Sequence, residues 1–413
     1  MVPEGWVHTS LGDLLEFKNG YNTEKANYGG GVPFINVSEV LKHESLTADL
    51  IPGSVKLNEA AAKAYRVNRG DILFNRTSET TDEVGFTSVY LDKEPVIFGG
   101  FVIRGRPRNG SLFPEFARYA MRQPQVRSEI IRRSQGAVRS NVGQGELSKV
   151  AITLPPLPEQ RKIADILSTW DAAIEKTETL LATARTQKRA LMQSLLTGRR
   201  RFPEFEDQPW KEVRLGELLT SMDAGCSVNS SDRGAAEEEC GVLKTSCVSG
   251  GIFEWRNNKA VLEAAEVQRL KEPVLAGTVI MSRMNTSALV GANGYVSRDY
   301  PNLFLPDRLW ALKSDPSLVL PRWLGHILSS RPVRYRLSSL ATGTSGSMKN
   351  ITKDDVRSLP VLLPSLDEQA AIDAALHSWD LEADKLLSLT VQMRSEKKAL
   401  MQQLLTGKRR VAV

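Results

Sequence analysis

Apolar side chains recur with alternating spacings of four and three residues along two stretches of the chain, within residues 154–201 and 362–413. This is the a/d pattern of a helix that packs along one seam against another helix. The first seam contains Ile163, Leu167, Trp170, Ile174, Thr177, Leu181, Ala184, Lys188, Leu191 and Leu195. The second contains Ile372, Leu376, Trp379, Ala383, Leu386, Thr390, Met393, Lys397, Leu400 and Leu404. Each stretch is predicted to form one long helix.

Both predicted helices have start and stop signals at matching places. Pro158 and Asp367 stand near the starts, each followed by Glu-Gln, and Gly198 and Gly407 follow the last apolar positions. About 40 residues at a rise of about 1.5 Å each give a rod of roughly 60 Å. Because the first helix leads into the second half of the chain and the second helix leaves it, helices that pack together must run antiparallel. A caliper with one globular block at each end is predicted.

The two helical stretches are copies of one segment. Residues 154–201 align without a gap on residues 363–410, and weaker matches upstream include Arg76 with Arg283. A repeat of this length predicts the architecture before any single residue is interpreted. Four parts are expected, namely a first target recognition domain (1–153), a first helix (154–201), a second target recognition domain (202–361) and a second helix (362–413).

The two blocks before the helices have the pattern of mixed α+β domains. Short β-rich runs lie at 32–37, 71–74 and 96–103, and runs at 278–281 and 309–312 echo them. A helix is predicted at 114–133 and again at 321–340. The expected fold is therefore α+β, with two pseudo-twofold-related globular domains joined by two long antiparallel coiled-coil helices.

Composition narrows the class of protein. The 413 residues carry a formal charge of +6, which fits a polyanionic partner. No leader pattern opens the chain and no run of 18 apolar residues occurs, so a cytoplasmic protein without a membrane partner is expected. Neither the three cysteines nor the four histidines have metal-binding spacing, and no disulfide framework is indicated.

Several motifs then resemble a known family. The motifs are PPLPEQRKIADIL (155–167), LLTGRRRF (195–202), LPSLDEQ (363–369) and LLTGKRR (404–410). They look like the two helical repeats of the specificity subunits of type I restriction–modification systems. The polar loop at 341–351 also resembles a Gly-rich loop found late in that family's recognition domains.

The resemblance implies that each block reads one half of a split double-stranded DNA site. It also implies that the helices set the gap and hold two methyltransferase subunits, with restriction subunits as further partners. S-adenosylmethionine would then belong to the methyltransferase, and ATP and Mg to the restriction subunit. This chain would bind no cofactor and would be non-catalytic.

The sequence lacks motifs expected of an enzyme, which agrees with a non-catalytic chain. The chain has no GxxxxGK[ST] phosphate loop, and its Pro155-Pro156 pair belongs to a helix entry instead of a methyltransferase motif. Two alternatives remain open. One is a DNA-recognition subunit of a related methyltransferase or nuclease system, and the other is a coiled-coil adaptor without sequence-specific DNA binding.

Candidate DNA-binding residues cluster after matched strands and in two late loops. Arginine can bond guanine in bidentate fashion, asparagine can bond adenine, and hydroxyls can bond bases or phosphates. The candidates are Asn75, Arg76, Thr77, Ser78, Arg139, Ser140, Asn141, Arg283, Asn285, Thr286, Ser347, Lys349 and Asn350. Solvated loop ends with a structural arginine are the alternative for Arg76 and Arg283.

Other basic and aromatic residues have two possible roles each. The arginines within 114–133 and 321–340 either neutralise phosphates or lie on a solvated helix face. The basic runs 199–201 and 408–410 are interpreted as helix-end charges that complement the dipole. Seam tryptophans indicate core packing, whereas the seam lysines mark either a local opening or a register device.

Overall fold

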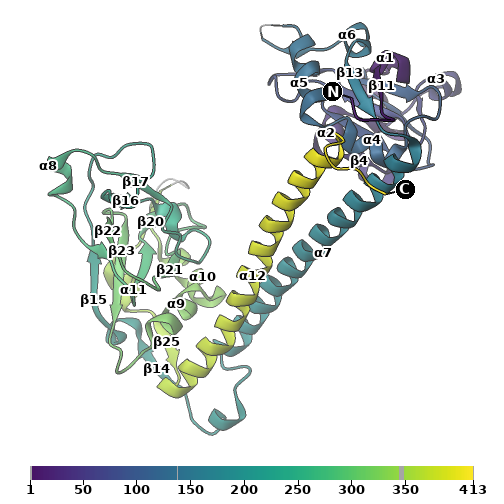
Figure 1. The fold of residues 1–413 in the computed structure, drawn as a ribbon. Coiled ribbons are helices and arrows are strands. Elements are labelled where there is room, and N and C mark those ends of the chain that lie inside the picture. The colour runs from purple at the N-terminus through teal and green to yellow at the C-terminus, as the bar shows by residue number, and fades with distance from the viewer. Residues whose placement is uncertain (1, 137, 344–347, 413) are drawn as a thin grey trace. The chain divides into compact units, whose positions relative to one another are not determined.

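The computed structural model describes residues 2–136, 138–343 and 348–412, which divide into two compact units. One unit is Met1–Glu178 with Ser388–Val413, and the other is Thr179–Leu387. Each unit therefore combines one globular block with the adjoining parts of the two long helices, labelled α7 and α12 in Figure 1.

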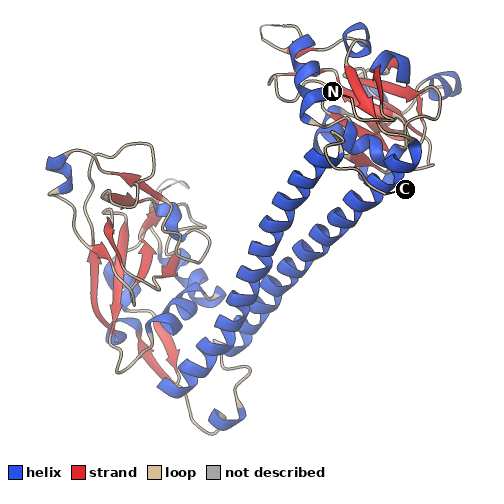
Figure 2. Ribbon diagram, in the orientation of Figure 1, coloured by secondary structure: helices blue, strands red, loops and turns tan. Residues whose placement is uncertain are grey.

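Both blocks contain strands and short helices, as Figure 2 shows. In the first block, one sheet has the order β2 (Leu15–Asn19), β11 (Val102–Pro107), β7 (Ile72–Asn75), β9 (Thr87–Tyr90), β4 (Ser45–Leu46). A second sheet has the order β5 (Ser54–Val55), β3 (Tyr28–Ile35), β10 (Val96–Phe98), β6 (Arg66–Val67). Two small sheets pair β1 (Val7–Ser10) with β13 (Ala151–Leu154) and β8 (Thr77–Ser78) with β12 (Ser140–Asn141).

The second block repeats these sheets. The first has the order β15 (Leu219–Ala224), β23 (Leu309–Ser314), β19 (Val279–Ser282), β21 (Asn293–Tyr295). The second has the order β17 (Asn258–Ala260), β16 (Gly241–Leu243), β22 (Tyr300–Phe304), β18 (Pro273–Val274). The small sheets pair β14 (Lys211–Arg214) with β25 (Pro360–Leu363) and β20 (Met284–Asn285) with β24 (Lys349–Asn350). The weak sequence repeat therefore corresponds to a repeat of topology, except that β4 adds a fifth strand beside β9 in the first block.

Short helices complete each block. The first block has α1 (Leu11–Leu14), α2 (Val37–Lys42), α3 (Glu59–Ala64), α4 (Pro114–Ala120), α5 (Pro124–Arg133) and α6 (Gln144–Ser148), with 3-10 turns at Lys25–Asn27 and Ala48–Leu50. The second has α8 (Ala264–Val267), α9 (Pro321–Ser329), α10 (Arg331–Leu340) and α11 (Lys353–Arg357), with 3-10 turns at Pro203–Phe205, Leu215–Leu218 and Thr245–Val248.

Several predicted element bounds were wrong, and proline and glycine explain most of the differences. The helices expected at 114–133 and 321–340 are each split in two, because Pro124 and Pro332 begin a new helix in their first turns. The strand expected at 96–103 is two strands, β10 and β11, which are separated at Gly99-Gly100. The run at 32–37 ends its strand at Ile35, and α2 starts at Val37.

The two long helices are confirmed. Helix α7 (Leu157–Leu195) and helix α12 (Leu366–Leu404) have 39 residues each. Gly198 and Gly407 follow them with φ angles of +69°. This left-handed conformation favours glycine and stops a helix, as the sequence predicted.

In each unit the start of one long helix and the end of the other lie in the same core. Ile163 and Leu404 belong to the core of the first block, and Ile372 and Leu195 to that of the second. Within each unit the two helical segments therefore run antiparallel. The residues predicted to pack between the helices are all buried or half-buried, namely Ile163, Leu167, Trp170, Leu181, Leu191, Leu195, Ile372, Leu376, Trp379, Leu386, Leu400 and Leu404.

The seam lysines pair with aspartates of the opposite helix. Lys188 Nζ lies 2.5 Å from Asp380 Oδ1 in one unit, and Lys397 pairs with Asp171 in the other. Both lysine side chains are less than one-fifth exposed, so each pair is partly desolvated. A partly buried charge favours only the alignment that supplies its partner. The pairs therefore support a register device over a local opening.

The repeated Glu-Gln motif starts with a buried carboxylate that joins three segments of each unit. Glu159 accepts hydrogen bonds from Trp6 Nε1 (3.1 Å) and from the Arg410 guanidinium (2.8 and 2.9 Å). In the other unit, Glu368 accepts from Trp210 Nε1 (2.8 Å) and from Arg201 (2.9 and 2.7 Å). The last arginine of each basic run is thus an ion-pair partner, which the dipole interpretation missed.

The glutamine of the motif fastens each block to its helix. Gln369 is fully buried; its Oε1 accepts from Leu320 N–H (2.8 Å), and its Nε2 donates to the carbonyls of Leu318 (3.2 Å) and Pro364 (3.0 Å). Gln160 makes the same three types of bond in the first unit. The repeat of Glu-Gln is therefore structural.

Replacing Gln369 by alanine is expected to lower the free energy of unfolding by about 3 kcal/mol, because backbone groups lose partners in a buried site at about 1–3 kcal/mol each. Chemical denaturation of the purified chain measures this loss. Gln403→Ala, at an exposed position of the same helix, is the control. Equal stability of the two variants would contradict the anchoring role.

Candidate nucleic-acid interface

Arg76 lies at the bend between β7 and β8, where two hydrogen bonds fix its backbone. Its N–H donates to Phe101 O (2.9 Å), and its carbonyl accepts from Val142 N–H (3.0 Å). The residue is exposed, and within the described part of the chain its guanidinium has no hydrogen-bond or ion-pair partner. A rigid backbone therefore presents a free cationic side chain.

The small β8–β12 sheet brings the second group of candidates beside Arg76. Asn141 lies opposite Thr77 in this sheet, and Thr77 Oγ1 donates to Asn141 Oδ1 (2.6 Å). Arg139 is exposed and forms an ion pair with Glu79 (3.0 Å). Residues more than 60 positions apart thus form one polar cluster at the end of β7.

Three candidates of the first block shape this cluster instead of facing outward. Asn75 is fully buried; its Nδ2 donates to Glu83 O (3.0 Å) and its Oδ1 accepts from Thr77 N–H (3.3 Å). Ser78 and Ser140 are also buried. A side chain whose polar atoms are already bonded inside the fold is not available to a base. The structure therefore corrects the direct contact expected of Asn75.

The second block fixes the backbone of Arg283 by the same pair of hydrogen bonds. We call this arrangement, an arginine after a strand with its N–H and carbonyl both bonded, the arginine frame. Arg283 N–H donates to Arg308 O (3.0 Å), and its carbonyl accepts from Ile351 N–H (3.0 Å). Its guanidinium lies over the Trp310 ring at 5.8 Å. Its buried Nε has no hydrogen-bond partner among the described residues. Arg283 is half-buried, whereas Arg76 is exposed.

The remaining candidates of the second block lie around the β20–β24 sheet, where Asn285 is opposite Lys349. Thr286 is exposed, and its N–H donates to Asn285 Oδ1 (2.9 Å). Lys349 Nζ donates to Gly343 O (2.7 Å), whereas the buried Asn350 Oδ1 has no partner among the described residues. Ser347, also predicted to bind DNA, lies outside the described residues.

Several arginines within the stretches 114–133 and 321–340 bond backbone carbonyls, a role that the sequence did not predict. Arg122 donates to the carbonyls of Thr87 (2.7 Å) and His43 (2.8 Å), and burial lowers its pKa to about 10. Burial likewise lowers the pKa of Arg127 and Arg334, which donate to backbone carbonyls. These guanidiniums are internal hydrogen-bond donors. Their donor groups bond the fold itself, so they do not lie free on a solvated helix face.

A sequence signal for these internal arginines was present. Val126-Arg127 and Val333-Arg334 match in the two halves of the chain, and so do Val84-Gly85 and Val290-Gly291. Matched pairs of a buried valine with an arginine or a glycine indicate a shared packing arrangement. The positive charge of these arginines instead favoured the prediction that they contact DNA phosphates.

The described residues also bear on metal-ligand groups, disulfides and membrane-spanning helices. Across residues 2–136, 138–343 and 348–412, His, Cys, Asp and Glu form no group of three or more that could hold a metal ion. The three cysteines are free thiols. No helix in these ranges combines the length and the apolar character needed to cross a membrane.

Comparison with known proteins relates these features to one family. Residues 3–184 match the family model described as "Type I restriction modification DNA specificity domain". The EcoKI specificity subunit of Escherichia coli K12 is 26% identical over 386 residues, which cover 90% of this chain and 81% of the relative. The putative MjaX specificity subunit of Methanocaldococcus jannaschii is 25% identical, covering 99% of this chain and 95% of the relative.

Solved structures share the fold over nearly the whole chain. The S subunit of a type I system from M. genitalium has a TM-score of 0.56 at 15% identity, covering 98% of this chain and 96% of its own. A chain from a study of complex assembly in a type I system has a TM-score of 0.61 at 17% identity, covering 98% of both chains.

Proposed function

We propose, since the chain belongs to the DNA specificity subunits of type I restriction–modification systems, that each of its blocks reads one half of a split double-stranded DNA site. The observation that carries this proposal is the repeated arginine frame. Arg76 follows β7 and Arg283 follows β19, which are equivalent strands of the equivalent sheets in the two blocks, and both residues are fixed by equivalent backbone bonds. Two equivalent frames with different surrounding side chains suit two different half-sites.

The chemistry of each frame fits the DNA major groove. A guanidinium can make a bidentate contact with guanine, and neighbouring hydroxyl and amide groups can bond other base edges or phosphates. Arg76 with Thr77 and Asn141 supplies this set in the first block. Arg283 with Thr286 and Lys349 supplies it in the second.

The long helices are the proposed docking elements for two methyltransferase subunits. Helix α12 exposes the apolar side chains of Leu381, Leu387, Leu389 and Val391, each more than 40% exposed. Exposed apolar side chains on a long helix suit a protein partner. In this assembly S-adenosylmethionine belongs to the methyltransferase, and ATP and Mg belong to a restriction subunit. This chain then contributes DNA recognition and spacing, and the chemistry lies with its partners.

Specific DNA binding is expected to depend on the methyltransferase, which adds phosphate contacts to those of this chain. The complex is expected to bind its site about tenfold or more tightly than the isolated chain, because each added phosphate contact releases counterions. Fluorescence anisotropy with labelled duplexes measures both dissociation constants. The site itself is found by sequencing methylated bases in a host that carries both proteins.

Equal affinity of the isolated chain and the complex would contradict this dependence. A complex that binds DNA without any sequence preference would favour the adaptor alternative instead. A scrambled duplex of the same length, measured at the same salt concentration, separates sequence preference from general attraction to phosphates.

A further inference from the structure

Each arginine frame is followed by a loop with an exposed tip, and an arginine of a nearby helix bonds the loop backbone; this arginine is buried in the first block and half-buried in the second. The first loop is residues 79–85, between β8 and β9, and the second is residues 286–291, between β20 and β21. Arg127 donates from α5 to the carbonyls of Val84 (2.8 Å) and Asp82 (2.7 Å). Arg334 donates from α10 to the carbonyls of Val290 (2.8 Å) and Ala288 (2.9 Å).

Both loops also end at a glycine that is held in the same way. Gly85 N–H donates to Asn75 O, and Gly291 N–H donates to Ser282 O, both at 2.7 Å. Both glycines have left-handed φ angles, +63° and +71°. A Cβ at Gly85 would lie 2.2 Å from Ile130 Cγ2, and one at Gly291 would lie 2.9 Å from the Arg334 guanidinium. Glycine therefore allows the arginine-bearing helix to approach the loop.

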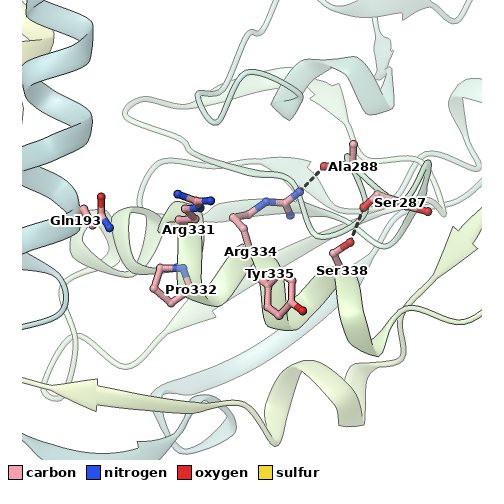
Figure 3. Close-up of a pocket in the computed structure, with 8 residues that line it drawn as sticks. All are labelled: Gln193, Ser287, Ala288, Arg331, Pro332, Arg334, Tyr335 and Ser338. Carbon is pink, nitrogen blue, oxygen red and sulfur yellow. Dashed lines mark hydrogen bonds between the residues drawn. The ribbon is translucent and has the colours of Figure 1, made fainter.

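Figure 3 shows the second loop from the side of its arginine. Arg334 and Ser338 reach from α10 to the carbonyls of Ala288 and Ser287, and the Ser338 bond is 2.7 Å long. Arg331 and Tyr335 line the adjacent pocket of about 520 Å³. The loop backbone is therefore held by hydrogen bonds from α10, while residues 286–288 remain exposed.

The exposed parts of the loops differ in chemistry although their supports match. Residues 79–83 are all exposed and include three carboxylates, Glu79, Asp82 and Glu83. Residues 286–289 have none. Carboxylates are repelled by phosphates but can accept a hydrogen bond from cytosine N4, whereas hydroxyls can bond several bases. Matched supports with unlike tips are suited to reading unlike half-sites.

We propose that residues 79–83 and 286–289 determine the two half-sites, and that Arg127 and Arg334 are positioning residues that hold these loops in the reading conformation. This inference rests on the proposed function. A guanidinium that bonds two carbonyls of one loop removes the freedom of the loop before DNA binds. Fixing a loop in its bound conformation improves discrimination, because less ordering is left to binding.

The test uses the full chain in complex with its methyltransferase partner. Dissociation constants are measured for the cognate duplex and for two duplexes, each with a base change in one half-site. Their ratios give the discrimination at each half-site. Arg127→Gln is expected to lower discrimination at one half-site about tenfold, the scale of one good base contact, and to change the other less than about twofold. Arg334→Gln is expected to do the reverse.

Further variants separate the role of the Arg127 side chain from a general loss of folding. Arg127→Lys should recover part of the lost discrimination, because an ammonium can still donate to a carbonyl. Replacing the exposed residues 79–81 by Gly-Ser-Gly alters the first loop without changing Asp82 or Val84, whose carbonyls bond Arg127, and should weaken the same half-site even if Arg127→Gln fails to fold. Arg69→Gln, at the other end of β7, and Arg233→Gln, in a surface ion pair, should leave both ratios unchanged.

A folded Arg127→Gln or loop variant that weakens both half-sites equally, or neither, would overturn the proposal. Thermal unfolding of each complex distinguishes a loss of fold from a loss of discrimination. A wild-type complex with no two-part preference would overturn the proposed function, and this inference with it.

Discussion

Exchanging residues 1–153 for the equivalent block of a relative is expected to change one half of the methylated DNA sequence completely and to leave the other half intact. The physical reason is that each block has its own core, its own arginine frame and its own loop. Sequencing of methylated bases in a host that carries the chimera and its methyltransferase measures the result.

The structure also says which contacts such a chimera must keep. The first block is fastened to the helices of its unit through Trp6 with Glu159, through Phe113 N–H with Gln160, and through Arg118 with Asp171. A donor block should therefore carry tryptophan and arginine at positions 6 and 118. The reciprocal exchange of residues 202–361 is the matched control and should change only the other half. A chimera that is folded and active but changes both half-sites would show that the blocks read DNA jointly.

Replacing Arg76 by alanine is expected to weaken binding to the cognate site by about 1–3 kcal/mol, the range of one bidentate base contact, or roughly fivefold to 150-fold. The loss should concern one half-site, because Arg76 belongs to one block. Arg283→Ala should weaken the other half-site. Dissociation constants on duplexes altered in one half-site at a time measure the assignment.

The Arg76→Lys variant separates a base contact from a phosphate contact. Lysine keeps the charge but lacks the planar pair of donors that guanine requires. If Arg76 binds a base, lysine should restore general DNA affinity but not the discrimination. Full recovery of discrimination by lysine would indicate a phosphate contact. An alanine variant that binds like the wild type would leave Arg76 as a solvated loop residue, the alternative that the sequence also allowed.

The repeated internal arginines show how composition can mislead. Arg76 and Arg127 are the same type of residue in the same block, yet one is exposed and the other is buried against backbone carbonyls. The matched valine beside Arg127 indicates a shared packing arrangement, but it does not identify the groups to which Arg127 donates. Only the position of α5 beside the loop decides that Arg127 is an internal donor.

The sequence by itself determined the two long helices, their ends and the duplication of the chain. These features depend on a periodic apolar pattern and on glycine and proline at helix ends, which act over a few residues. The α+β class of the blocks followed from short β-rich runs in the same way. The Glu-Gln repeat was visible too, although the bonds of its side chains were not.

The tertiary structure alone decided which distant residues meet. Thr77 pairs with Asn141, Lys188 with Asp380, and Glu159 with Arg410. Such pairs join segments that are 64 to 251 positions apart. No local period encodes them, because a side chain's partner depends on how sheets and helices pack. For the same reason the sequence could name candidate DNA-binding residues, whereas the fold separated exposed Arg76 from buried Asn75.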